Sequence, residues 1–156
     1  MKKKSQFYIF AAVILMSTVF LITANRSSID VSQMEDLRNY HKNYIHEANI
    51  VINNAIMYDK NITKELMDYT NSYIDYAKTK EMDLGIVFLY SKDDKIHIVN
   101  FLNEPVLVST VGLEVNSGQS LTIDLVDTVT LNYQGNNYNY FFSSDILFKT
   151  LFVENE

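Results

Sequence analysis

The apolar and polar positions of this chain form three successive patterns. The first is an apolar run over residues 7–24 without a charged side chain. As a helix this run is about 27 Å long, close to the roughly 30 Å hydrocarbon core of a bilayer. Its bulky members include Phe7, Phe10, Leu15 and Phe20. The pattern predicts a transmembrane helix over residues 6–25 that contacts membrane lipid.

The charges on either side of the run predict its orientation. Lys2, Lys3 and Lys4 precede it, whereas Arg26 follows it. Because the flank with the excess of Lys and Arg stays in the cytoplasm, we expect a cytoplasmic amino terminus and an extracellular carboxyl-terminal domain. The predicted location is therefore the cell membrane, with a single span.

The second pattern has the 3.6-residue period of amphipathic helices and covers residues 30–82. One helix is expected over residues 31–58 and another over residues 63–81. The turn between them is short, which favours an antiparallel hairpin. We interpret the tyrosines of the second helix as a face packed on its neighbour, with a ligand-stacking platform as the alternative. The apolar stripes contain Met34, Leu37, His41, Tyr44, Ala48, Val51, Ala55 and Tyr58, then Leu66, Tyr69, Tyr73 and Tyr76.

The third pattern begins at Leu84 and alternates apolar and polar residues, as β-strands do. Turns are indicated at residues 91–95 and 134–137, where Asp, Asn and Gly occur. Short strands at close spacing are typical of an antiparallel sheet or sandwich. We expect six or seven strands in a β head at residues 84–154, from the segments 84–90, 96–101, 106–115, 121–126, 129–133, 138–142 and 146–153. The predicted fold class is thus α+β, with a transmembrane helix, a helical hairpin and an antiparallel β region in that order.

The composition of the chain argues against some classes of binding partner and bound group. The 156 residues include 13 Lys and Arg against 19 Asp and Glu, a net charge of −6. Without Lys2, Lys3 and Lys4 the balance is 10 against 19, or −9. Such an acidic domain argues against nucleic acid, whose binding needs clustered Lys and Arg. Cysteine is absent, which excludes disulfides and thiolate metal sites.

No arrangement of residues predicts catalysis, a metal or a cofactor. His41 and His46 are five residues apart, whereas a metalloprotease helix needs two His four apart. We expect His41 to be a packed, hydrogen-bonded residue and His97 a residue on a strand face. Asp93 with Asp94, and Asp124 with Asp127, are read as solvated charge. The chain also lacks a Gly-rich phosphate loop and a serine nucleophile elbow.

One short motif indicates a modification. Asn61, Ile62 and Thr63 form an N-glycosylation sequon in the expected turn between the helices, where an extracellular domain has room for a glycan. Asn61 is therefore a candidate acceptor.

The beginning of the chain resembles archaeal type IV pilin-like proteins with a class III signal peptide. Their basic leader is cut before the apolar helix, after a basic and a small residue, and Gln often follows the cut. Lys4, Ser5 and Gln6 match this order. The resemblance implies a leader at residues 1–5, cut between Ser5 and Gln6. The fifth residue after that cut is Phe10, where many pilins carry Glu.

Two other fates of the apolar run remain open. It is either an uncleaved anchor or a secretory signal cut after Ala24, where a small residue permits cleavage. We expect a structural or adhesive surface protein, a pilin-like subunit or minor component of a surface assembly. Its partners would be copies of itself or other pilin-like subunits. The alternative is a monomeric, membrane-anchored binding or sensing module without catalytic activity.

Overall fold

The computed structural model describes residues 36–143 and 145–154. The chain divides into two compact units, Met1–Tyr40 and His41–Glu156, and the fold described below is that of the second unit. The predicted leader and the apolar helix at residues 6–25 lie outside the described residues. Within the described part, no helix is both long and apolar enough to cross a membrane.

Two helices precede the strands, which confirms that part of the prediction. The first covers residues 36–57, and α2 covers Ile62–Lys78. Asn61 ends the turn between them and caps α2, because its side-chain oxygen accepts a hydrogen bond from the Lys64 amide at 3.0 Å. The helices are antiparallel neighbours, since Tyr44 contacts Thr70 while Glu47 contacts Tyr69.

The rest of the chain forms two antiparallel sheets of four strands each. Sheet A has the order β5-β2-β1-β8, and sheet B has the order β4-β3-β6-β7. The strands are β1 (Leu84–Lys92), β2 (Lys95–Asn100), β3 (Val106–Val108), β4 (Leu113–Val115), β5 (Ser120–Asp124), β6 (Thr128–Tyr133), β7 (Asn136–Phe141) and β8 (Phe148–Glu154).

The structure thus confirms the α+β class and the antiparallel arrangement but corrects the number of strands. The segment at residues 106–115 was expected to be one strand, and it is a hairpin of β3 and β4 in which Val106 pairs with Val115. Gly112 makes this turn possible with a φ of +69°, and its amide donates to the carbonyl of Val108.

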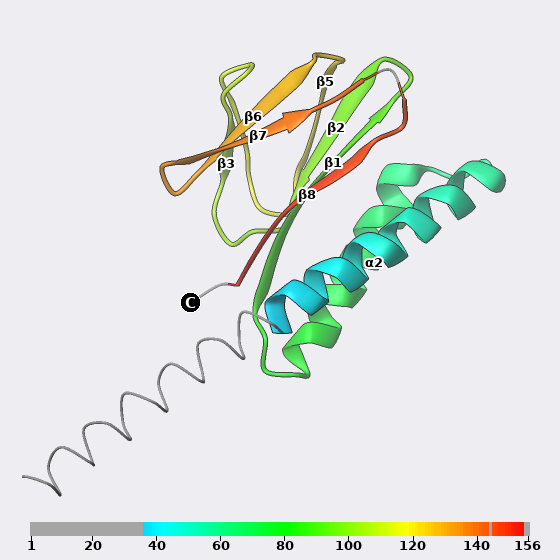
Figure 1. Ribbon diagram of the computed structural model, residues 1–156, viewed down its shortest axis with the longest axis vertical. Coiled ribbons are helices and arrows are strands. Elements are labelled where there is room, and N and C mark those ends of the chain that lie inside the picture. Colours follow the sequence, from blue (N-terminus) through cyan, green and yellow to red (C-terminus); the bar gives the residue numbers. More distant parts are fainter. Residues whose placement is uncertain (1–35, 144, 155–156) are drawn as a thin grey trace, which may run out of the picture. The chain divides into compact units, whose positions relative to one another are not determined.

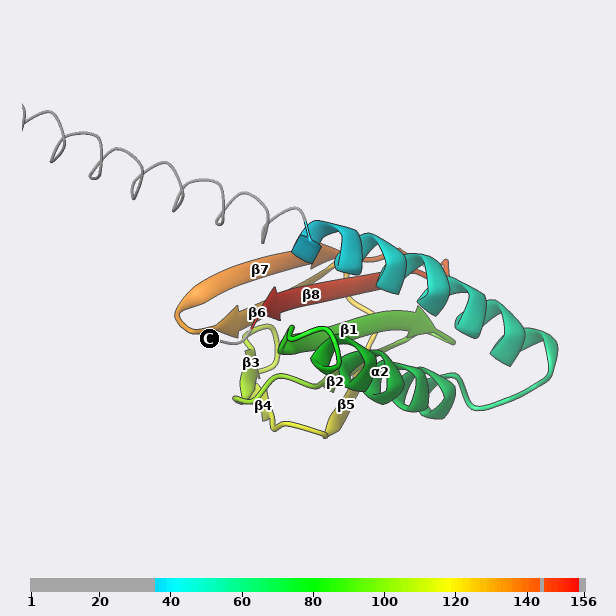
Figure 2. The ribbon, with the colours of Figure 1, turned by 90° about the horizontal axis from the view of Figure 1, so that it is seen from below.

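Helices and sheets form three layers, with sheet A in the middle. Figure 1 shows both helices on one side of β1, β2 and β8, with β3, β6 and β7 on the other side, and Figure 2 shows the same layers from below. Residues 84–91 of β1 are all buried, because this strand is covered on both faces. The sequence of a strand buried on both faces is a continuous apolar run, without alternation of apolar and polar residues.

Between the sheets lies the larger apolar core. Sheet A contributes residues of all four of its strands that point away from the helices, and sheet B contributes its inward positions. This core contains Val87, Leu89, Ile96, Ile98, Leu102, Val106, Val108, Val115, Ile123, Val129, Leu131, Tyr133, Phe142 and Leu151.

The helices pack on sheet A through aromatic rings. Tyr44 is fully buried, and its ring centroid lies 5.2 Å from that of Tyr73 and 5.9 Å from that of Phe152 on β8. The Thr70 hydroxyl donates to the carbonyl of Leu66 at 2.6 Å, so the Tyr44 hydroxyl must donate to Thr70 at 2.8 Å. Burial raises the pKa of Tyr44 because the charged phenolate is disfavoured there.

Two tyrosines expected in the apolar stripes are exposed. Tyr58 is 65% exposed because it lies in the turn beyond the first helix. Tyr76 is 54% exposed because Tyr73 and Ala77 occupy the buried side of α2. Its ring contacts Lys80, whose ammonium nitrogen lies 5.8 Å from the ring centroid.

A buried asparagine at the end of β2 organises the loop before β3. The Asn100 side-chain nitrogen donates to the carbonyls of Glu104 at 2.9 Å and Val115 at 2.8 Å. Its side-chain oxygen accepts from the Leu102 amide at 2.8 Å. Asn100 is 0% exposed, so three backbone groups depend on one side chain that water does not reach.

Replacing this side chain should destabilise the fold. We expect Asn100→Ala to lower the free energy of unfolding by about 2–4 kcal/mol, because buried carbonyls lose their donors. Urea unfolding followed by circular dichroism measures the change. Asn116→Ala is the matched control, since Asn116 is exposed and its side chain bonds Gln119 alone among the described residues. Equal losses for the two variants would contradict the role given to Asn100.

Candidate functional site

Most of the sequence-predicted site residues lie outside the described residues. This holds for Ser5 and Gln6 at the expected leader cut and for the membrane-helix residues Phe7, Phe10, Leu15 and Phe20. Asn61 is described and exposed. Its capping hydrogen bond uses the side-chain oxygen, so the side-chain nitrogen that would carry a glycan is not used by the cap.

The three histidines do not gather into a site. His41 lies on the first helix, where its Nε2 is 2.8 Å from the Thr150 hydroxyl and its ring centroid 5.1 Å from that of Phe152. This confirms the predicted packed, hydrogen-bonded residue. Burial lowers the pKa of His41, because the imidazolium form loses hydration. His97 lies on β2, and β1 separates that strand from β8.

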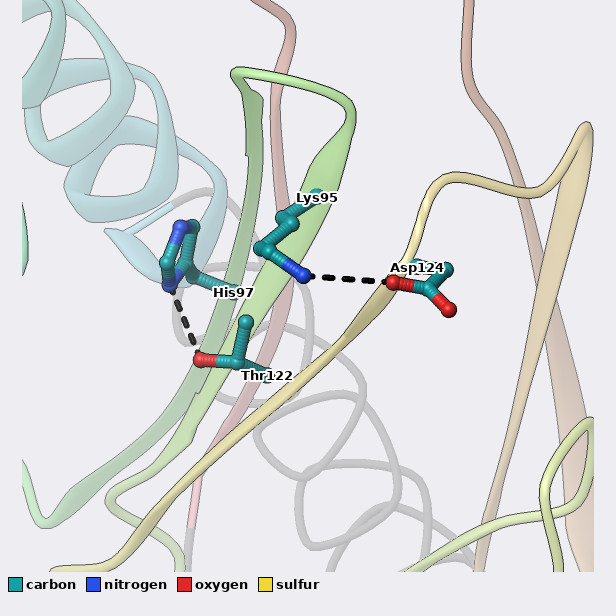
Figure 3. A network of polar contacts seen from close by, with 4 residues as sticks. All are labelled: Lys95, His97, Thr122 and Asp124. Carbon is teal, nitrogen blue, oxygen red and sulfur yellow. Dashed lines mark hydrogen bonds and ion pairs between the residues drawn. The ribbon is translucent and has the colours of Figure 1, made fainter.

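Within the described part of the chain, His97 has a hydroxyl partner and no hydrogen-bonded carboxylate. Its Nδ1 lies 3.1 Å from the Thr122 hydroxyl, and its ring stacks on Tyr90 with centroids 4.6 Å apart. Asp124 on the same strand as Thr122 pairs with Lys95 at 3.2 Å (Figure 3). A nucleophile triad needs a carboxylate that orients the histidine, and in this cluster the carboxylate is held by a lysine instead.

Burial and the nearby cations Lys92 and Lys95 lower the pKa of His97, against a smaller opposing effect of Asp93. Among the described residues, no three His, Asp or Glu side chains are grouped as metal ligands. The part of the chain that the structure describes offers two further candidates for function, a surface on sheet B and a hollow.

The outer side of sheet B carries an ordered polar surface, named here the amide–hydroxyl face. It consists of alternate residues of β6 and β7: Thr128, Thr130, Asn132, Asn137, Asn139 and Phe141. The residues between them, such as Val129 and Leu131, are buried in the core. The face thus follows from the two-residue period of the strands.

Cross-strand hydrogen bonds hold this face in one arrangement. The Thr130 hydroxyl donates to the Asn139 side-chain oxygen at 2.8 Å, and the Asn132 side-chain nitrogen donates to the Asn137 side-chain oxygen at 2.8 Å. Asn139 and Asn137 each keep an NH₂ group that can donate to a partner. At the end of the face, Phe141 is 69% exposed.

Asn139 and Phe141 alternate with Tyr138 and Tyr140 in the sequence, but this alternation does not tell which set faces water. Tyr138 and Tyr140 are half-buried and pack against the core. The exposed surface of this hairpin is therefore rich in Asn and Thr rather than in Tyr. Its six residues carry no charge in a chain whose net charge is −6.

β8 is the last strand of sheet A and β7 is the last strand of sheet B, and their outer edges differ in how far they are covered. The Tyr140 hydroxyl donates to the carbonyl of Thr150 at 3.2 Å and so covers part of the β8 edge. Burial raises the pKa of Tyr140 to about 12, so the hydroxyl keeps its proton near neutral pH. β7 is the outer strand of sheet B, and the amide of Phe142 donates to Asp127 on the inner side. The backbone amides of the alternate residues Asn137, Asn139 and Phe141 consequently point away from β6.

Comparison with protein-family models, with curated proteins and with solved structures found no match for this chain.

The lowered pKa values predict how stability depends on pH. In the unfolded chain His41 and His97 take up protons near pH 6.5, whereas in the folded state their lowered pKa values resist protonation. The free energy of unfolding should therefore be highest above pH 6.5 and should fall as the pH drops below it.

Urea unfolding between about pH 7.5 and pH 5 measures this slope. His41→Asn and His97→Asn should each give a shallower slope, and the double variant should give the shallowest. A slope that is the same in the parent and in the double variant would refute the assignment.

Proposed function

We propose that this chain is a single-span, outward-facing surface protein with a structural or adhesive role, acting as a pilin-like subunit or minor component of a surface assembly. The observation that carries the proposal is the amide–hydroxyl face, an uncharged and pre-ordered surface on an acidic domain. Such a face can approach another acidic subunit closely without bringing like charges together.

The amino-terminal sequence supports the membrane part of the proposal. Three lysines precede the apolar run, and Lys4, Ser5 and Gln6 match the order of residues around a class III leader cut. In this proposal the apolar helix packs among like helices or in lipid, and the β head makes contacts outside the membrane.

The chemistry of the face suits contacts with protein surfaces. Asn side chains donate and accept hydrogen bonds in adaptable ways, and an exposed aromatic ring adds apolar contact area. Because Asn137 and Asn139 are fixed by partners on β6, little side-chain entropy remains to be lost on binding.

The alternative, a monomeric anchored module that binds or senses a ligand, is favoured by a polar hollow at one end of the sandwich, described below. The two functions predict different states of the chain in its membrane. An assembly subunit loses its leader and oligomerises, whereas a plain anchor does neither.

The leader is tested by intact mass and amino-terminal sequencing of the protein extracted from native membranes. We expect a mature terminus at Gln6, because the residues around it match a leader cut. Replacement of Lys4 by Glu should block processing and leave the full mass. A terminus at Met1 or Lys2 in the parent protein would contradict the pilin-like function and favour the anchored module.

Charged substitutions on the amide–hydroxyl face test whether this surface takes part in assembly. Asn139→Glu and Phe141→Glu should weaken chemical cross-linking of the chain into larger species on intact cells about tenfold, because an added carboxylate opposes close contact with another acidic subunit. Circular dichroism should show an unchanged fold, since both side chains are exposed. Asn53→Glu, at an exposed position of the first helix, is the matched control. Cross-linking that survives both face variants would exclude this surface from assembly.

A further inference from the structure

A polar hollow of about 400 Å³ opens at one end of the β region. Three segments form it: the loop between β2 and β3, the turn between β6 and β7, and the end of β8. The polar side chains that line it are Asn103, Glu104, Tyr133, Gln134, Tyr138 and Glu154.

Tyr133 has a buried ring and an accessible hydroxyl, and this hydroxyl has no hydrogen-bond partner among the described residues. The residue as a whole is 7% exposed. No fully buried side-chain polar atom in that part of the chain lacks a partner, so the Tyr133 hydroxyl is not sealed in the core. It opens into the hollow that Tyr133 lines, where a ligand can supply the missing hydrogen bond.

Among the described residues that line the hollow, two are negatively charged and none is positively charged. These two are Glu104 and Glu154, and neither forms an ion pair among the described residues. The polar contact of Glu104 inside the hollow is a long one, 3.5 Å from the Gln134 side-chain nitrogen. Burial, followed by the negative charge of Glu104, raises the pKa of Tyr133, which places that carboxylate near the phenol.

The walls of the hollow are fixed by the fold. Asn100 holds the backbone carbonyl of Glu104 at 2.9 Å and so positions the loop between β2 and β3. On the opposite wall, Gln134 and Gly135 form a two-residue turn with φ values of 49° and 78°, which matches the twist of β6 and β7. A site formed by such segments is organised before a ligand arrives.

We propose that this hollow binds a primary ammonium group, carried either by a lysine side chain of a partner protein or by a small diamine. An ammonium group has three donors and no acceptor, which complements carboxylates and the oxygen of the Tyr133 hydroxyl. Tyr133 and Tyr138 also line the hollow, and aromatic rings near a cation can add attraction. The inference does not depend on assembly of the chain, because a monomeric module would present the same hollow.

Calorimetric titration of 1,5-diaminopentane into the purified full-length chain tests the proposal. We expect saturable binding that Glu104→Gln weakens about tenfold and Tyr133→Phe weakens about threefold, since the first variant removes a negative charge, the second removes a hydrogen-bond acceptor, and each keeps the shape of the residue. Glu114→Gln removes an exposed carboxylate outside the lining and should leave the affinity unchanged.

The neutral analogue 1,5-pentanediol has the same length and should not bind. Equal binding of the diol would overturn the proposal in favour of a hydroxylated ligand such as a sugar. Equal effects of Glu104→Gln and Glu114→Gln would reduce the binding to general attraction by an acidic protein, and an absence of binding heat would refute it.

A second titration separates the two sources of the ammonium group. Nα-acetyl-lysine methylamide presents one ammonium on a lysine stem, whereas the diamine presents two. Tighter binding of the lysine derivative supports a partner protein, and tighter binding of the diamine supports a free small molecule that spans both Glu104 and Glu154. Both results uphold ammonium recognition, and failure of both compounds to bind overturns it.

Discussion

The structure depends on the burial of β1 from both sides. Every residue from Leu84 to Ser91 is removed from water, and each alternate side chain belongs to a different core. Val87 and Leu89 join the core between the sheets, whereas Phe88 packs toward the helices, near Phe148. Helices, sheet A and sheet B are thereby tied through one central strand, so a polar substitution in β1 would be felt in two layers.

Thr150 on β8 makes a second connection between the layers. Its hydroxyl bonds His41 of the first helix, and its carbonyl accepts from Tyr140 of sheet B. One residue of the middle layer therefore contacts both neighbouring layers through polar groups. The histidine in the apolar helical stripe thus has a hydrogen-bond partner on the middle sheet.

Much of the fold could be predicted from the periodicity of the sequence. The change of period near Leu84 marks the transition from helices to strands, and the turn at Gln134 and Gly135 was recognisable from its residues. The hairpin of β3 and β4 was missed because Val and Leu on both sides of Gly112 read as one continuous strand. Tyr58 was misplaced because the stripe was extended past the end of the first helix, and Tyr76 was misplaced because Tyr73 and Ala77 occupy the buried side of α2.

The candidate sites likewise divide into one that the sequence pattern predicts and one that only the packing of distant segments creates. Alternation along β7 separates the residues of the amide–hydroxyl face from those of the core. The hollow around Tyr133 could not be predicted, because Glu104, Tyr133 and Glu154 lie far apart in sequence and meet through the packing of three separate segments. Asn100 was also missed as an organiser, because an asparagine at a strand end looks like an ordinary turn residue until its three backbone partners are seen.

The difference between the edges of β7 and β8 determines which symmetry a pair of subunits joined at this side would have. With the Thr150 carbonyl engaged by Tyr140, β7 is the more open edge at this side of the sandwich. If two copies joined through β7 alone, each would present the same antiparallel edge to the other, and a two-fold axis would relate them. Such a contact is complete after two subunits and gives a closed pair. Continued growth of a filament would thus have to come from a head-to-tail contact between two different surfaces of the chain.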